Sequence, residues 1–304
     1  MSGQCVWCGS GESAPVIVRR DRLGEEHFRY LRCGRCGLVR LETPFSWEEK
    51  ARAYPLAYEA YQEAPENWLL RLGLRWYWSR RVWAMNRFFS RPPGVALDVG
   101  CATGGFLAAL RERGWEVCGV EPHPEAAARA AAWLGTAAVR AAPLEAVDFP
   151  PASFDLVTLW DVLDHLPDPP AALRWITRWL RPGGLLVLGL PYLDSWDARL
   201  FGPDWLGWDA PRHLYLFPEA TLREIVAGAG FRVIAARCFY GGYGSLVASL
   251  DMAVREHLGE RWLGRFLRGL VRLRLWRYAG WPYFRLAEWA GRGPIRTYFC
   301  RWGR

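Results

Sequence analysis

The sequence predicts an α/β protein whose core is a doubly wound, mostly parallel sheet. Apolar segments of strand length alternate with helical segments from about residue 94 onward. This alternation is typical of parallel βαβ units, in which each helix crosses over between two neighbouring strands. The chain has 304 residues, of which 51% are hydrophobic. That is enough to bury the core of one large domain together with a small additional region.

The expected elements follow one another after the turn at Pro92-Pro93-Gly94. Strands are expected at Val95–Val99, Glu116–Val120, Ala137–Arg140, Phe154–Trp160, Gly184–Leu190, Phe231–Cys238 and Pro294–Trp302. Helices are expected at Gly104–Arg113, Pro124–Leu134, Pro170–Leu180 and Pro218–Ala229. The last strand should insert antiparallel beside the sixth, which closes a seven-stranded sheet between two layers of helices.

Five regions are expected along the chain. They are a cysteine-bearing region at 1–43, a helical connecting region rich in tryptophan and arginine at 44–91, the α/β core at 92–244, a basic helical insert at 245–290 and the last core strand at 291–304.

Charge is distributed unevenly along the chain. The net charge is +8, and residues 251–304 hold twelve arginines against four acidic residues, a surplus of eight. The basic character therefore belongs to one segment, while residues 1–250 balance to zero. No stretch reaches the roughly 18 uncharged apolar residues of a membrane span. No apolar signal segment follows Met1, so we expect a cytoplasmic protein.

Four of the eight cysteines form two closely spaced pairs, Cys5-x-x-Cys8 and Cys33-x-x-Cys36, with 24 residues between the pairs. Two such turns direct four thiolates to one point, which is the tetrahedral cage that Zn²⁺ prefers. The spacing predicts a structural zinc ribbon, and free or redox-active thiols are the alternative. The other four cysteines are scattered through apolar stretches, which favours a reducing compartment.

A glycine-rich loop, Leu97 to Gly105 (LDVGCATGG), ends an apolar strand and opens a helix. This is the context of a nucleotide-binding loop, where glycines let the backbone approach a ligand at the carboxyl end of the strand. Glu121 lies at the end of the next expected strand, where an acid accepts hydrogen bonds from ribose hydroxyls. The loop alone does not separate a nicotinamide cofactor from another nucleotide.

The loop resembles the first motif of the class I methyltransferases, which bind S-adenosylmethionine on a Rossmann-like sheet. The family's acid-x-Gly-x-Gly-x-Gly run matches Asp98, Gly100, Ala102 and Gly104, with alanine in place of the middle glycine. The family's ribose-binding acid matches Glu121. The resemblance implies that these five residues bind S-adenosylmethionine.

Later segments extend the resemblance to about residue 240. Phe154 to Pro169 matches the fourth-strand motif of the family, with Asp164-His165 where Glu-His is usual, and RPGG at 181–184 matches the turn before the fifth strand. The resemblance implies that Trp160 and His165 lie beside the cofactor. For Trp160 the alternative is a plain core tryptophan.

Asp161, Asp164 and His165 have the i, i+3, i+4 spacing of one helical face. Ubiquinone-type O-methyltransferases are similar here and hold a divalent metal with such a cluster. The favoured alternative is that Asp164 and His165 cap the loop beside the cofactor.

The N-terminal pattern resembles a subgroup that carries a zinc ribbon ahead of the methyltransferase domain, including sugar C-methyltransferases and ubiquinone-type O-methyltransferases. The same subgroup carries a W-D-x-P-R-H-L segment, present here from Trp208 to Leu214. The resemblance implies methyl transfer to a small-molecule or carrier-linked acceptor, such as a sugar, glycan, lipid or quinone-like molecule. The alternatives are an RNA methyltransferase that binds nucleic acid with the ribbon and basic helices, and a non-catalytic cofactor-binding module. Nucleic acid is the less favoured partner, because no N-P-P-[YF] tetrad follows the fourth strand.

Two residues of this segment are candidates for catalysis. His213 has a side chain whose pKa suits a general base, and it lies in a loop expected to fold over the carboxyl ends of the strands. The alternative is that His213 bonds the backbone and holds the loop. Arg212 could grip an anionic acceptor, and its alternative role is to pair with Asp209.

The basic insert predicts an amphipathic helix between Leu258 and Tyr278. Apolar residues such as Trp262, Phe266 and Leu270 recur at helical spacing, and arginines recur on the opposite side. Such a helix is typical of the headgroup layer of an anionic membrane, which would place the protein at the inner membrane surface. The alternative is that the apolar face packs on the domain or on a second subunit.

Overall fold

The computed structural model describes residues 3–22, 24, 26–43, 68–89, 93–259, 261–271, 273 and 276–303. The chain divides into two compact units. The first contains Met1–Ser46, Leu190–Glu224 and Ala236–Thr297, and the second contains Trp47–Gly189, Ile225–Ala235 and Tyr298–Arg304. Residues 190–224, expected within the α/β core, therefore group with the N-terminal region. The first half of the expected connecting region, residues 44–67, lies outside the described residues.

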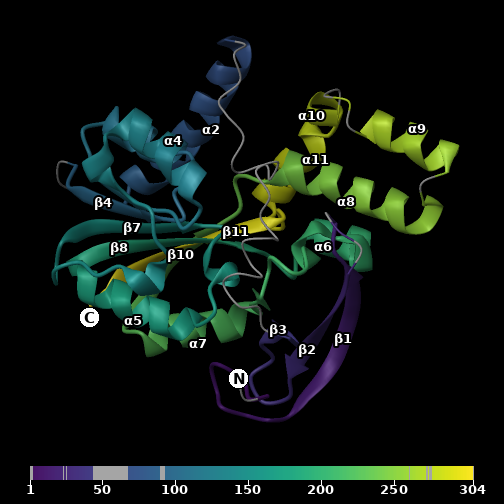
Figure 1. The fold of residues 1–304 in the computed structure, drawn as a ribbon, viewed down its shortest axis with the longest axis horizontal. Helices are drawn as coiled ribbons and strands as arrows, with labels where there is room; N and C mark the ends of the chain where they lie inside the picture. The colour runs from purple at the N-terminus through teal and green to yellow at the C-terminus, as the bar shows by residue number, and fades with distance from the viewer. Residues whose placement is uncertain are drawn as a thin grey trace. The chain divides into compact units, whose positions relative to one another are not determined.

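The seven-stranded sheet has the strand order β10-β11-β8-β7-β4-β5-β6 (Figure 1). Its strands are β4 Val95–Val99, β5 Glu116–Val120, β6 Val139–Arg140, β7 Phe154–Trp160, β8 Leu180–Pro191, β10 Phe231–Arg237 and β11 Ile295–Trp302. The pairs β4–β5, β4–β7, β5–β6 and β7–β8 are all parallel. The last strand lies beside β10, the sixth of the expected strands. This order confirms the predicted fold class.

Helices of the second unit cover both faces of this sheet. They are α2 Trp68–Asn86, α3 Gly105–Arg111, α4 Pro124–Leu134 and α5 Pro169–Trp179. Figure 1 shows α4 over one face and α5 over the other. Every residue of β7 is buried, as expected for a strand that is covered on both sides. The Asp168 carboxylate caps α5 by accepting a hydrogen bond from the amide of Ala171, at 2.8 Å.

Two strands differ from their predicted bounds by two residues or more. Strand β8 begins at Leu180 and includes the RPGG segment. Within that segment Gly183 adopts a positive φ of 76° and the register to β7 shifts between Leu180 and Leu185. Residues Thr136–Ala138 form a 3-10 turn (η2), which leaves β6 only two residues long. Because β6 is the edge strand, it has a neighbour on one side only.

The first unit holds an antiparallel sheet of four strands in the order β1-β2-β3-β9. Its strands are β1 Ser13–Arg20, β2 His27–Cys33, β3 Val39–Leu41 and β9 Tyr215–Leu216. Three of them come from the predicted ribbon, and the fourth comes from the segment that follows the W-D-x-P-R-H-L motif. The buried core of this sheet also draws on both parts of the chain: Tyr30, Val39, Leu41, Trp205, Trp208, Ala210, Leu214 and Leu216.

The remaining helices of the first unit are α6 Trp196–Phe201, α8 Gly242–Leu258, α9 Trp262–Val271, α10 Trp276–Ala279 and α11 Trp281–Trp289, and α7 Glu219–Gly228 contains residues of both units. The basic insert is thus helical, as expected. Among the described residues, none of the helices has the length and apolar character needed to cross a bilayer.

Candidate functional site

The loop after β4 has the backbone of a ligand-binding turn. Gly100 and Gly104 adopt positive φ angles of 71° and 80°, which glycine tolerates. A Cβ atom at Gly100 would lie 2.5 Å from a methyl group of Val162, so this loop packs closely on the loop that follows β7. Ala102 also adopts a positive φ, of 47°. A non-glycine residue in that region stores strain, which is concentrated at functional sites.

Glu121 is the residue that holds this loop in place. Its side chain is buried, and its two carboxylate oxygens accept hydrogen bonds from the amides of Ala102 and His123, both at 2.9 Å. One carboxylate therefore joins the loop after β4 to the loop after β5. The predicted position of Glu121 at the carboxyl end of β5 is the one that the structure gives it.

Asp98 is a buried carboxyl group at the end of β4, where it accepts a 2.6 Å hydrogen bond from the hydroxyl of Thr158. Burial raises the pKa of Asp98 to about 7, and the Thr158 bond and the charge of Arg81 oppose that rise only in part. The negative charge of Glu121 contributes to the raised pKa of Asp98 as a smaller cause than burial. The carboxylate form of Asp98 would thus be stabilised by a cation placed beside it.

The end of β7 carries the other predicted cofactor residues. Trp160 is buried and packs edge-on against Phe106 of α3, with ring centroids 5.4 Å apart. Asp161 follows with a positive φ of 57°. The loops after the adjacent strands β4 and β7 thus each contain a strained non-glycine residue, Ala102 and Asp161. His165 ends a single 3-10 turn, η4 Leu163–His165, and its Nε2 lies 3.7 Å from the Asp164 carboxylate.

Asp161 does not share a helical face with Asp164 and His165. It precedes the 3-10 turn and its carboxylate lies 3.7 Å from the guanidinium of Arg81. The three residues therefore do not form the predicted i, i+3, i+4 arrangement, because the left-handed backbone at Asp161 separates it from the turn.

Arg81 on α2 is a residue that the sequence reasoning missed. Its guanidinium is buried and stacks on the rings of Tyr77, Trp78 and Trp160, at 4.7, 4.8 and 4.5 Å from their centroids. It also donates a 2.7 Å hydrogen bond to the hydroxyl of Tyr77. The only signal in the sequence was the concentration of aromatic residues and arginines between 68 and 83, which contained no recognisable motif.

The four predicted metal ligands come together in the first unit. The sulfur atoms of Cys5, Cys8, Cys33 and Cys36 all lie within 4.8 Å of one another. The Cys5–Cys36 and Cys8–Cys33 sulfur pairs are 3.6 and 3.5 Å apart. A tetrahedral zinc with Zn–S bonds of about 2.3 Å requires sulfur atoms about 3.8 Å apart. The donor set and its spacing therefore fit zinc.

Arg212 is fully buried between two carboxylates of the first unit. Its guanidinium pairs with Asp209 through Nε at 2.9 Å and with Asp21 through Nη2 at 2.7 Å. Burial by itself would raise the pKa of Asp209, but Arg212 and Arg22 hold it well below its usual range. This is the pairing that the sequence offered as the alternative to a catalytic role, extended to the ribbon through Asp21 and Arg22.

His213 is also buried, and both its backbone and its ring are held within the same unit. The hydroxyl of Tyr30 donates to the carbonyl of His213 at 2.8 Å, and Nδ1 of the ring lies 2.9 Å from the carbonyl oxygen of Gly207. Since a carbonyl only accepts, Nδ1 carries the proton in this bond and Nε2 carries the lone pair. Burial lowers the pKa of His213, which keeps the ring neutral near pH 7.

Residues 75–236, just over half of the chain, match a family described as a methyltransferase domain. The chain belongs to this methyltransferase family. The matched region includes the loop after β4, Glu121 and the end of β7, which form the site described above.

Three relatives match shorter stretches. An uncharacterized methyltransferase of Mycobacterium sp. strain KMS is 43% identical over 31% of this chain and 37% of its own length. The ubiquinone biosynthesis O-methyltransferase of Idiomarina loihiensis is 36% identical over 37% of this chain and 49% of its own. The 2-methyl-6-phytyl-1,4-hydroquinone methyltransferase of Synechocystis sp. is 34% identical over 36% of this chain and 34% of its own length. The chain thus spans less than half the length of each of these relatives.

The buried groups of the second unit fit S-adenosylmethionine. That molecule carries a ribose diol, an ammonium group, a carboxylate, a purine ring and a sulfonium. Glu121 and Asp98 are carboxyl groups, which are acceptors suited to a diol and an ammonium group, and Arg81 is a cation, which suits a carboxylate. Arg81 and Glu121 both lie close enough to Asp98 to shift its pKa. Trp160 supplies an aromatic ring beside them.

Proposed function

We propose that this protein transfers a methyl group from S-adenosylmethionine to a small-molecule or carrier-linked acceptor. The observation that carries the proposal is the glycine loop after β4, held by the buried carboxylate of Glu121 inside the region that matches the methyltransferase family. The cofactor, when bound, supplies an already activated methyl group on its sulfonium. The protein must therefore orient the acceptor, exclude water and remove a proton.

Different residues of the second unit would bind different parts of the cofactor. Glu121 would accept hydrogen bonds from the ribose hydroxyls, and Asp98 would face the ammonium group. Arg81 would hold the carboxylate, and its stacking between Trp78 and Trp160 fixes the position of that charge. Gly100 and Gly104 let the backbone approach the nucleoside without a side chain in the way.

We assign the removal of the acceptor's proton to Nε2 of His213. The hydrogen bond from Nδ1 to the Gly207 carbonyl fixes the tautomer, and the lowered pKa keeps the ring in the neutral form that a base requires. Arg212, in contrast, is occupied by Asp209 and Asp21. Its contacts support a role in holding the His213 segment on the ribbon and not in gripping the acceptor.

For the acceptor we propose a quinone-like or lipid-linked molecule with a hydroxyl or ring carbon to be methylated. One relative is named for ubiquinone biosynthesis and another for 2-methyl-6-phytyl-1,4-hydroquinone, a ring that carries an apolar phytyl chain. For the cysteine cluster we propose one structural zinc, because four thiolates leave no open position for water.

The cofactor proposal is tested by calorimetric titration of the purified protein with S-adenosylmethionine and with S-adenosylhomocysteine. We expect both to bind. The Glu121→Gln variant should weaken both by about tenfold to a hundredfold, because it loses two charge-assisted hydrogen bonds. Glu116→Ala is the matched control, since Glu116 is an exposed glutamate at the other end of β5.

Unchanged affinity in the Glu121→Gln variant would remove the ribose role of that residue. Failure of the wild-type protein to bind either molecule would overturn the methyltransferase proposal itself and favour a non-catalytic domain. The acceptor is tested separately, by following a labelled methyl group from the cofactor into organic or aqueous extracts. Label found only in RNA would contradict a quinone-like or lipid-linked acceptor.

A further inference from the structure

Helix α9 exposes a continuous apolar surface. Trp262 and Phe266 are 74% and 58% exposed, and Leu263 and Leu270 are each 40% exposed. At 100° per residue these four positions fall within about 100° of the helix circumference, so they form one stripe. We refer to them below as the α9 stripe. Isolated exposed apolar residues are ordinary, but a contiguous stripe of large side chains marks an interaction surface.

The other side of α9 is firmly packed, so the stripe is held outward by the fold. Gly264 and Val271 are buried, and a Cβ atom at Gly264 would lie 2.3 Å from the carbonyl oxygen of Gly259. Arg268 of α9 donates a 3.1 Å hydrogen bond to Asp251 of α8. Packing on the domain, the alternative that the sequence offered, thus accounts for one side of α9 and leaves the four residues of the stripe in solvent.

The charge around the α9 stripe is strongly positive. Residues 261–289 contain seven arginines and one acidic residue, Glu288. Glu288 is already paired with Arg285, at 2.8 Å, and Arg268 is paired with Asp251. Arg261 and Arg265 are exposed and lie immediately before and within the stripe. The surface therefore combines apolar side chains with a local excess of positive charge.

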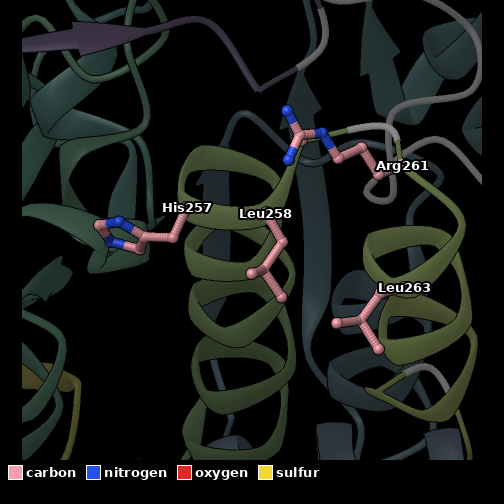
Figure 2. Close-up of a pocket in the computed structure, with 5 residues that line it drawn as sticks. His257, Leu258, Arg261 and Leu263 are labelled. Atoms are coloured by element: carbon pink, nitrogen blue, oxygen red, sulfur yellow. The ribbon is translucent and has the colours of Figure 1, made fainter.

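An open pocket adjoins the stripe at the turn between α8 and α9. It has a volume of about 390 Å³ and is lined by His257, Leu258, Gly259, Arg261 and Leu263. Figure 2 shows Leu258 and Leu263 between the two helices, with the guanidinium of Arg261 beyond them. Leu263 thus belongs both to the stripe and to the pocket wall, so the apolar surface continues into a hollow with a cation at its rim.

We propose that the α9 stripe and its arginines dock this protein on an anionic phospholipid bilayer. Aromatic and aliphatic side chains backed by arginine are the chemistry that enters the headgroup layer, and the pocket offers apolar walls next to a cation for one anionic lipid. A second copy of the chain fits less well, because a two-fold interface would place arginines against arginines. RNA would leave the exposed leucines without an apolar partner, since it binds proteins through phosphate contacts and base stacking.

Docking does not depend on the methyl-transfer activity, so it is tested by co-sedimentation of the full-length protein with vesicles. The vesicles contain phosphatidylcholine alone or with roughly one third phosphatidylglycerol. The wild-type protein should pellet only with the anionic vesicles at low salt. The variant Trp262→Ala/Phe266→Ala should bind them at least about tenfold more weakly, because apolar insertion is lost. Arg265→Ala should weaken binding about fivefold.

Trp133→Ala is the matched control, because Trp133 is a 53% exposed tryptophan on α4 of the other unit. It should bind vesicles as the wild type does. A wild-type protein that stays in the supernatant with anionic vesicles would overturn the proposal. Equal loss of binding in the Trp133 control would also overturn it. So would sedimentation velocity showing a dimer without lipid that the Trp262→Ala/Phe266→Ala variant dissociates, since a second copy would then occupy the stripe.

Discussion

At the scale of single residues, the candidate cofactor site contains ionisable groups whose burial disfavours the charged form. Asp98 shows this most clearly. Its folded-state pKa is raised to about 7, above the value of about 3.9 in an unfolded chain. Between these two pH values the folded protein binds more protons than the unfolded chain, so the free energy of unfolding falls as the pH rises through this window. Above pH 7 the buried carboxylate therefore destabilises the cofactor-free protein.

We accordingly expect Asp98→Asn to stabilise the cofactor-free protein at pH 8 while it weakens cofactor binding. Asparagine can still accept the hydrogen bond from Thr158 but carries no charge. Thermal unfolding should show a Tm raised by about 3 °C or more, with little change at pH 5, where Asp98 is already protonated. The exposed Asp194→Asn is the control and should leave the Tm unchanged. A lower Tm at pH 8 would show that the carboxylate is stabilising and that the sign argued here is wrong.

His213 gives a second prediction, through a variant that separates its two ring nitrogens. In His213→Asn the amide nitrogen can still donate to the carbonyl of Gly207, but the lone pair of Nε2 is lost. If Nε2 is the base, kcat should fall about a hundredfold or more, with the affinity for S-adenosylhomocysteine unchanged. In the wild type, activity should persist as the pH falls past 6.5 and decline only below, because burial lowers the pKa of His213.

Near-normal turnover of the Asn variant would contradict the role of His213 as a base. It would show instead that His213 acts by holding its segment through the Gly207 bond, which asparagine can reproduce.

The sequence predicted the positions of those residues whose place follows from the local strand pattern, and their contact with the cofactor stays a prediction. Gly100, Gly104 and Glu121 occupy the ends of adjacent parallel strands, so their positions follow from the strand pattern alone. Arg81 could not be found in the same way. Its role depends on Trp160, which lies far away in the sequence and reaches it only through the tertiary fold.

At the scale of elements, the parallel sheet was predictable and the small antiparallel sheet was only partly so. Strands β4 to β8 are mostly separated by helices, and this local pattern predicts parallel strands. It does not predict that β7 lies beside β4 and not beside β6. Strand β9 has only two residues and pairs with β3, which lies about 175 residues earlier in the chain. No local pattern announces a pairing of that kind, because it is selected by the burial of Trp208, Leu214 and Leu216 against Tyr30.

The packing of Trp208 on Tyr30 also explains the W-D-x-P-R-H-L segment, which leads into β9 and so completes the four-stranded sheet of the first unit. Its side chains reach the N-terminal strands in sequence: Trp208 packs on Tyr30, Asp209 pairs with Arg22, and Arg212 pairs with Asp21. We therefore expect Arg212→Ala to lower the free energy of unfolding by about 3–5 kcal/mol, because it leaves the buried Asp209 with Arg22 as its cation and takes Arg212 away from Asp21. Denaturant unfolding measures this.

Arg223→Ala is the control for that measurement. Arg223 pairs with Glu219 on the exposed side of α7, and loss of such a pair should change the free energy of unfolding by less than about 0.5 kcal/mol. If Arg212→Ala destabilised no more than this control, Arg212 would be available for the acceptor, as the alternative interpretation of the sequence holds.

At the scale of the whole molecule, the cysteine cluster and the glycine-rich loop belong to different compact units. The four cysteines lie in the first unit, and the loop after β4, Glu121 and Trp160 lie in the second. The cysteine cluster is also bonded to a segment far from it in sequence, since the Thr221 hydroxyl donates to the carbonyl of Cys36 at 2.5 Å. A bound zinc would thus contribute to the folding of the entire first unit, including the segment that carries His213.

This division predicts that removing zinc abolishes methyl transfer but leaves cofactor binding intact. We expect about one zinc per chain in freshly purified, reduced protein, held by four thiolates. A strong chelator at mildly acid pH, or the variant Cys33→Ser, should lower the stability of the first unit by several kcal/mol. Binding of S-adenosylhomocysteine should persist, because its proposed binding residues lie in the second unit, whereas methyl transfer should be lost with the His213 segment.

Cys300→Ser is the matched control, since Cys300 is a buried cysteine of β11 outside the cluster. Metal analysis that finds well under one zinc per chain would contradict the ribbon. Simultaneous loss of cofactor binding and of the first unit would show that the two units fold as one and that the separation of functions is wrong.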